Sequence, residues 1–90
     1  MKTALELVKN HLGMTDITSE EKQWLNAYIA EATADLESDD ISDSRLATDL
    51  GQTTIALIAL DLINGKSPYD NNSITAMRVR LSSQSRGDSV

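Results

Sequence analysis

The stretch TTIALIALDLING, residues 53–65, contains the longest apolar run in this chain of 90 residues. Residues 55–63 are all apolar except Asp61. Leu, Ala and Ile in a long run that stops at Gly65 are typical of a helix, which we expect to span residues 44–64. A helix that is apolar on nearly every side lies either at the centre of a fold or at a subunit interface.

Asp61 is the one charged residue within the apolar run. At about 100° per residue it falls on the apolar face, between Leu57 and Ile58. A buried carboxylate without a partner is costly. We therefore expect Asp61 at the edge of the core, paired with a Lys, an Arg or a Tyr hydroxyl of its own chain, or in an ion pair across a subunit interface.

Two amphipathic helices are predicted before the apolar run. The first covers residues 4–12, with Leu5, Val8 and Leu12 on one face, and ends at Gly13. The second begins at the capping box formed by Thr18–Glu21 and continues to about residue 37. Its apolar stripe consists of Trp24, Leu25, Tyr28, Ile29, Ala32 and Leu36.

The remaining segments complete an all-α prediction. The polar stretch ESDDISDS, residues 37–44, is turn and cap material, so Ser42 or Asp43 opens the next helix. Residues 74–82 fit a helix, which we favour, although their alternation also fits a strand. We expect one domain, residues 1–82, built as a small bundle of about four helices around a central apolar helix (46–64), and a disordered, flexible tail over 83–90.

Composition excludes several classes of protein. The absence of cysteine rules out disulfides, thiolate metal sites and thiol nucleophiles. The N-terminus turns polar at once, and no run approaches the roughly 18 apolar residues of a membrane span. These features predict a soluble, cytoplasmic protein that does not enter a membrane.

Charge is distributed unevenly along the chain, whose net charge is −6. Residues 1–65 hold four basic and twelve acidic side chains, whereas the remainder holds four basic and two acidic ones. The body should therefore repel a nucleic-acid backbone. Arg78 and Arg80, in the basic last quarter, are candidates for contact with an acidic partner.

Each candidate for catalysis or ligand binding fails on its surroundings. His11 is the only histidine and lacks partners for a triad or a zinc site. The acidic cluster Asp35, Glu37, Asp39, Asp40 and Asp43 lacks the Gly and Glu of an EF-hand loop. Ser44 follows Asp43 as in an acyl carrier protein, but the similarity ends there, and Arg86–Asp88 spells an integrin-type tripeptide by chance. We expect no enzyme, no cofactor and no metal.

One pattern extends over the first two thirds of the chain. It reads Val8-Lys9-x-x-Leu12-Gly13-Met14, then acidic residues Asp16, Glu20 and Glu21, then Trp24-Leu25-x-x-Tyr28-Ile29-x-Glu31-Ala32-x-x-x-Leu36. This pattern resembles the head–tail connector family of long-tailed double-stranded DNA bacteriophages and prophages, which are small all-helical adaptors or head completion proteins. The resemblance covers residues 3–64 and, weakly, 74–82. In place of the family's Tyr-x-Asn-Arg-like stretch, this chain has Tyr69-Asp70-Asn71-Asn72.

The resemblance implies a structural role in the virion, reached by assembly in the host bacterial cytoplasm. Family members form a ring under the portal protein after DNA packaging, extend the DNA channel and bind the tail or a stopper protein. The isolated chain can remain a monomer, and DNA passes without specific binding. A closed ring needs a heterologous interface. The interface candidates are Ile55, Ile58, Asp61, Leu62, Tyr69, Arg78 and Arg80.

Two other functions stay open at this point. A small bacterial interaction module would bind one protein partner through the surplus apolar surface. A carrier protein modified at Ser44 is the weaker alternative.

Overall fold

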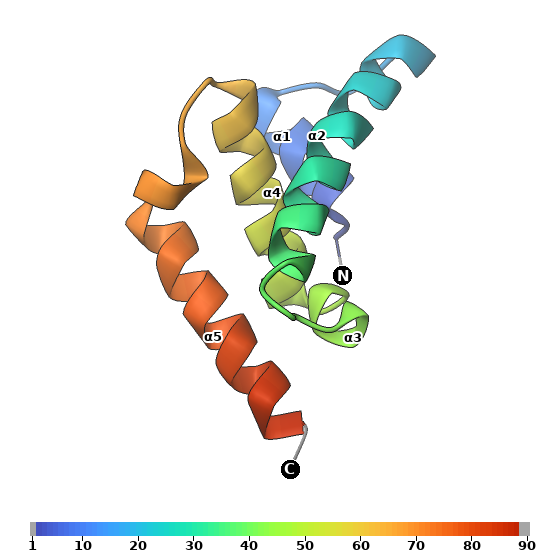
Figure 1. Cartoon of the computed structure of the whole chain (residues 1–90). Helices are drawn as coiled ribbons and strands as arrows, with labels where there is room; N and C mark the ends of the chain where they lie inside the picture. The colour runs from blue at the N-terminus through green and yellow to red at the C-terminus, as the bar shows by residue number, and fades with distance from the viewer. Residues whose placement is uncertain (1, 89–90) are drawn as a thin grey trace.

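The computed structural model describes residues 2–88, without the side chains of residues 83–88. This part of the chain is an all-α bundle without strands (Figure 1). Its elements are α1 (Ala4–Leu12), α2 (Ser19–Glu37), α3 (Asp43–Leu46), α4 (Asp49–Ile63), the 3-10 turn η1 (Pro68–Asp70) and α5 (Asn72–Asp88). None of these helices, as far as they are described, combines the length and the apolar content that crossing a membrane requires.

The apolar helix α4 lies at the centre of the bundle. It packs against α1, α2, α3, α5 and η1, with α5 on one side and the α1–α2 pair on the other (Figure 1). Every apolar side chain from Leu50 to Ile63 is buried or half-buried. An apolar helix of this kind was predicted either at the centre of the fold or at a subunit interface, and the central position is confirmed. Burial at the centre is enough to explain the apolar run IALIAL.

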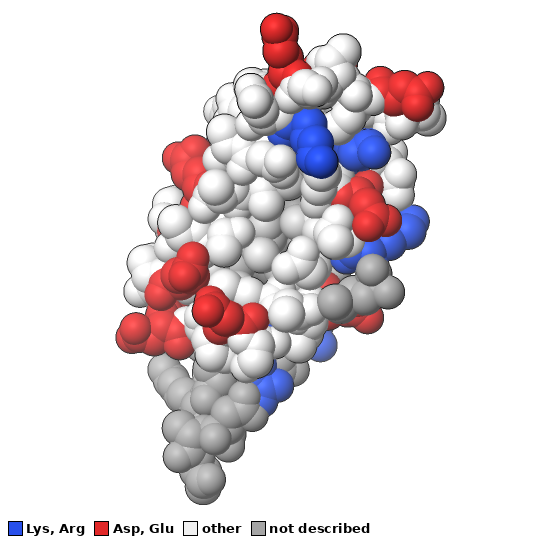
Figure 2. Space-filling view, turned by 90° about the vertical axis from the view of Figure 1, so that its right-hand side faces the viewer, with Lys and Arg blue, Asp and Glu red and all other residues white. Residues whose placement is uncertain are grey.

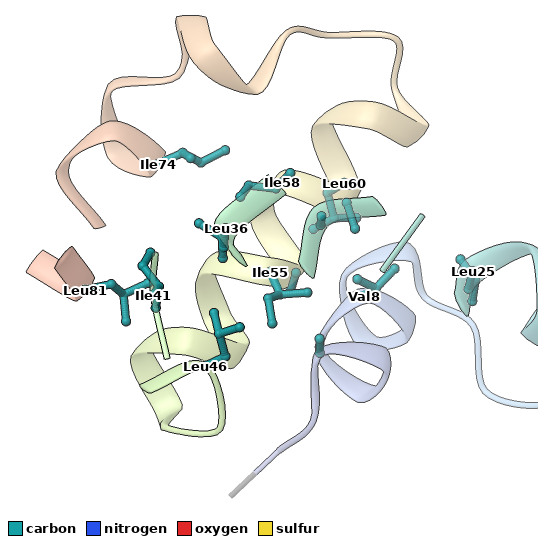
Figure 3. Close-up of a cluster of buried hydrophobic side chains, with 14 residues drawn as sticks. Val8, Leu25, Leu36, Ile41, Leu46, Ile55, Ile58, Leu60, Ile74 and Leu81 are labelled. Carbon is teal, nitrogen blue, oxygen red and sulfur yellow. The ribbon is translucent and has the colours of Figure 1, made fainter. Parts of the chain in front are cut away.

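Each of the helices α1 to α5 contributes side chains to the core around α4. Leu36 of α2 lies beside Ile55 and Ile58 of α4, while Leu81 of α5 lies beside Ile41 (Figure 3). The buried apolar residues are Ala4, Val8, Leu25, Ala32, Leu36, Ile41, Leu46, Ile55, Ala56, Ile58, Ala59, Leu60, Ile74 and Leu81. Aliphatic side chains thus fill the described core, as the absence of Phe from the chain led us to expect.

Local sequence signals set the ends of the first two helices where they were predicted. The side chain of Thr18 accepts a hydrogen bond from the backbone N–H of Glu21, and the Glu21 carboxylate accepts one from the backbone N–H of Thr18. Gly13 ends α1 in the left-handed region at φ 73°, which glycine enters without steric cost. The capping box and the glycine stop are confirmed.

The single helix predicted over residues 44–64 is wrong, because the chain breaks at Thr48. The backbone of Thr48 is extended, and its hydroxyl accepts from the N–H of Gly51 at 3.1 Å and donates to the carbonyl of Arg45 at 2.6 Å. Thr48 is therefore an N-cap, which separates the short α3 from α4. Ser42, one of the two predicted openers, caps α3.

Gly51 and Gln52 hold α3 and α1 against the start of α4. A Cβ atom on Gly51 would lie 2.4 Å from the carbonyl oxygens of Arg45 and Leu46, so the two backbones meet at this residue. The Gln52 side chain donates to the carbonyl of Leu46 at 2.9 Å and accepts from the N–H of Ala4 at 2.8 Å. One amide thereby connects three helices.

Residues 74–82 are helical, as favoured, and the strand alternative is wrong. The Asn71 side chain accepts hydrogen bonds from the backbone N–H groups of Ser73 and Ile74, which supports the first turn of α5. Ile74 and Leu81, one face of this helix, are fully buried. The tail predicted for residues 83–90 falls outside the part of the chain whose side chains are described.

Candidate interaction surface

The predicted interface residues do not share one surface. Ile55 and Ile58 are 2% and 1% exposed and belong to the chain's own core. Leu62 is half-buried, Arg80 is exposed, and Tyr69 is 68% exposed. The apolar flank of the central helix is therefore covered by the protein's own helices.

Asp61 lies at the edge of the core, half-buried, as predicted, but its hydrogen-bond partner within the chain is not the predicted Lys, Arg or Tyr. Its carboxylate accepts a hydrogen bond from the Asn71 amide at 3.2 Å, and no Lys, Arg or Tyr is its donor among the described residues. It also lines an open hollow of about 680 Å³ between the end of α4 and the start of α5. The bond joins these two elements within one chain.

A cluster of charged and aromatic side chains holds α5 to the C-terminal end of α2. The Arg78 guanidinium binds the carboxylate of Asp35, and its other amino group lies 3.0 Å from the carboxylate of Asp39. The Tyr69 hydroxyl donates to Asp35 at 2.7 Å. The guanidinium carbon of Arg78 lies 5.2 Å from the centre of the Tyr69 ring, within the range of a cation–π contact.

The three groups shift one another's pKa values. Burial raises the pKa of Asp35, but the hydrogen bonds from Arg78 and Tyr69 and the charge of Arg78 lower it by more, so it lies below its usual 3.8. Burial lowers the pKa of Arg78, and Asp35 and Asp39 raise it by more. The hydrogen bond from the Tyr69 hydroxyl to Asp35 raises the pKa of Tyr69. The shifts of Asp35 and Arg78 favour their charged forms, and the shift of Tyr69 favours the neutral hydroxyl that donates to Asp35.

Arg78 therefore has a structural role within the chain, whereas its selection as an interface candidate stays a prediction. Its guanidinium is occupied by two carboxylates of its own chain. Its partners Asp35 and Asp39 belong to the acidic cluster that was compared with an EF-hand loop in the sequence. Ion pairs between residues 43 positions apart carry no signal in a single sequence.

Two hollows lie along one face of α2, and the second of them is bounded by α4 and η1 as well. The first, of about 320 Å³, is lined by Trp24, Ala27, Tyr28 and Glu31. The second, of about 340 Å³, is lined by Glu31, Ala34, Asp35, Ser38, Ile58, Leu62, Pro68 and Tyr69. Because Glu31 belongs to both, we treat them as one feature, the α2 trough, with a length of about 20 Å at 1.5 Å per residue.

Trp24 stands at one end of the α2 trough rather than in the core. It was predicted in the apolar stripe with Leu25, but it is 46% exposed whereas Leu25 is fully buried. Adjacent residues differ by about 100° around a helix, so Trp24 falls outside the buried face. Its ring meets the Tyr28 ring edge to face, with centres 5.2 Å apart.

The surface as a whole is acidic. Figure 2 shows one face with uncharged atoms at its centre, acidic side chains around much of its rim and a few basic ones among them. Within the described residues, no group of three or more His, Asp or Glu side chains is arranged to hold a metal ion. His11 and Ser44 are both exposed, and the side chains of residues 86–88 lie beyond the described part.

Comparison with known proteins adds no relative. No protein-family model matches this chain, and neither a curated protein nor a solved structure matches it significantly.

The features of this surface that sequence reasoning missed are the hollow beside Glu31 and the exposed position of Trp24. Trp24, Tyr28 and Glu31 are spaced at i, i+4 and i+7, the spacing of residues that share a helix face. This spacing could have shown that these three residues form a face of their own, about 100° around the helix from the buried face of Leu25 and Leu36. The fully buried Leu36 shows which of the two faces is internal.

Proposed function

We propose that this chain is a structural assembly protein of a long-tailed bacteriophage or prophage, without catalytic activity. In this role it forms a ring between the portal and the tail or stopper protein and extends the DNA channel after packaging. It would be made in the host bacterial cytoplasm and end in the virion.

The observation that carries the proposal is the open α2 trough. The pattern that carries the resemblance to the connector family, residues 8–36, spans the second half of α1, the capping box and nearly all of α2. On the outer side of this unit lie an exposed Trp24 and hollows that no described part of the chain fills. Exposed aromatic side chains beside a hollow are typical of protein interfaces.

The apolar character of α4 does not support assembly, because its central position accounts for it. Surface charge gives separate support. A net charge of −6 and acidic side chains on the surface weaken the attraction of phosphate groups. A channel subunit with this surface would let DNA pass without holding it.

Native mass spectrometry of the chain over a concentration series, alone and with the portal protein, tests the proposal. We expect a closed ring of defined mass in the presence of portal. A chain that stays monomeric at every concentration, with portal present, would contradict it.

The α2 trough also favours a second candidate, a small helical module that binds one protein partner. The same experiment separates the two, because a module forms a defined heterodimer and no ring.

A further inference from the structure

The chain contains one arrangement in which an aromatic ring and a carboxylate together hold a cation. At the C-terminal end of α2, Asp35 binds the guanidinium of Arg78, which also lies over the ring of Tyr69. The carboxylate supplies charge and hydrogen bonds, and the ring face supplies cation–π attraction. All of its members come from the same chain.

The same pair of groups occurs one turn earlier on α2, but without a cation. Glu31 precedes Asp35 by four residues and shares a hollow with the rings of Trp24 and Tyr28. The Glu31 side chain has no ion-pair or hydrogen-bond partner among the described residues. An exposed tryptophan, a tyrosine and an unpaired carboxylate around one hollow form a site for a basic side chain.

A suitable cation lies on the outer face of α5. Arg80 follows Arg78 by two residues, which is about 200° around a helix, so Arg80 points away from α2 when Arg78 points toward it. Arg80 is exposed and has no ion-pair partner within the described residues. Its neighbour Val79 is 61% exposed, which gives the outer face of α5 an apolar group beside a positive charge.

We propose that Arg80 of one copy of this chain occupies the Trp24–Tyr28–Glu31 hollow of a second copy, with Val79 and Ala76 packed beside it against Ala27. Charge complementarity supports this partner, because an unpaired acid lies beside exposed apolar surface on α2 and an unpaired base lies beside exposed apolar surface on α5. The two faces differ, so the contact is heterologous. The inference rests on the proposed function, for which it names the contact between subunits.

The chain has no cysteine, so the contact can be tested by disulfide trapping between single-cysteine variants. Ala27→Cys and Ala76→Cys, both at exposed positions, are mixed under mild oxidation, one of them labelled with ¹⁵N so that intact mass separates mixed from like pairs. We expect mixed pairs to exceed like pairs several-fold. Ala47→Cys, also exposed, replaces Ala27→Cys as the matched control and should give only background linking to Ala76→Cys.

Charge reversal then identifies the groups. Arg80→Glu in the Ala76→Cys chain should reduce mixed linking to the control level, and adding Glu31→Arg to the Ala27→Cys chain should restore it. Mixed linking equal to the control, or unaffected by Arg80→Glu, would overturn the inference. A ring with portal but no such linking would leave the proposed function standing without this contact. Linking without a ring would support the contact and refute the proposed function.

Discussion

The two sides of α2 differ in what they contact. The inner side carries Leu25, Ala32 and Leu36, each fully buried and packed around the central α4. The outer side carries Trp24, Ala27 and Glu31 along an open trough. The inner side accounts for folding, since burial of apolar side chains dominates the stability of a small domain. Trp24, Ala27 and Glu31 are exposed and lie outside the buried core, so they are accessible to a partner.

The largest effect is expected from the inner side. Leu36→Ala removes a fully buried side chain that lies beside Ile55 and Ile58, so it should lower the free energy of unfolding by about 2–5 kcal/mol. Glu31→Ala, on the outer side of the same helix, should change it by less than about 0.5 kcal/mol. Urea denaturation followed by circular dichroism measures both, and similar losses for the two variants would remove the distinction.

The next largest effect is expected at the start of α4, the helix against which the inner side of α2 packs. Gly51→Ala would place a methyl group 2.4 Å from two carbonyl oxygens of α3, so α3 or α4 must shift. We expect a loss of about 1–3 kcal/mol, whereas Gly→Ala inside an unobstructed helix gains about 1 kcal/mol. Thr53→Ala, on the same helix, is the control and should cause no loss. A stabilised Gly51→Ala variant in thermal denaturation would contradict the close contact of the two backbones.

A smaller effect is expected where the trough ends at Asp35. Arg78→Met keeps an unbranched apolar stem but removes the cation shared by Asp35 and Asp39. Because the pair is neither fully buried nor fully exposed, we expect a cost of about 1–2 kcal/mol. Amide hydrogen exchange should become faster in α5 than in α1 or α4. The same substitution at exposed Arg80 should leave exchange in the monomer unchanged, and equal effects at both positions would contradict the assigned role of Arg78.

Acid should weaken the same cluster. The pKa of Asp35 is lower in the folded chain than its usual 3.8, so the unfolded chain takes up a proton first as the pH falls. The contribution of Asp35 to stability is therefore complete well above pH 3.8 and is lost as the pH falls through the folded-state pKa. Unfolding measured against pH should show a shallower acid dependence for Asp35→Asn than for the unmodified chain, and equal dependence in the two proteins would contradict the lowered pKa of Asp35.

An effect on stability no larger than that of Arg78→Met is expected from the exposed end of the trough. Trp24→Ala removes a ring that is 46% exposed, which should cost about 1–2 kcal/mol. Self-association should nevertheless decrease by at least tenfold, because an aromatic group at the centre of a contact contributes more than its neighbours. Sedimentation velocity of the two proteins compares their association. A variant that folds and associates like the unmodified chain would place the interface elsewhere.

Signals within one or two turns of helix were sufficient to predict much of the fold. Thr18 and Glu21 set the start of α2, and Gly13 the end of α1, through bonds to residues three or four positions away. The break at Thr48 was missed because its capping signal lies next to a long apolar pattern that fits one continuous helix. Its structural reason, the contact of α3 with Gly51, exists only in three dimensions.

The candidate site was less predictable for a similar reason. Arg78 and Arg80 are alike in sequence, yet one is bound to Asp35 and the other is exposed. The orientation of α5 decides which arginine is accessible to a partner. Its buried face, Ile74 and Leu81, is turned toward the bundle. Sequence reasoning could propose a basic contact but could not choose between the two residues.

Trp24 is the only tryptophan of the chain, so its fluorescence reports directly on the outer side of α2. The most direct test of that side as the assembly surface is acrylamide quenching of Trp24 over a concentration series, with the mass of the species measured in the same samples. We predict that quenching decreases and emission shifts to shorter wavelength as the mass rises. A rise in mass with unchanged quenching would show that the copies meet through another surface.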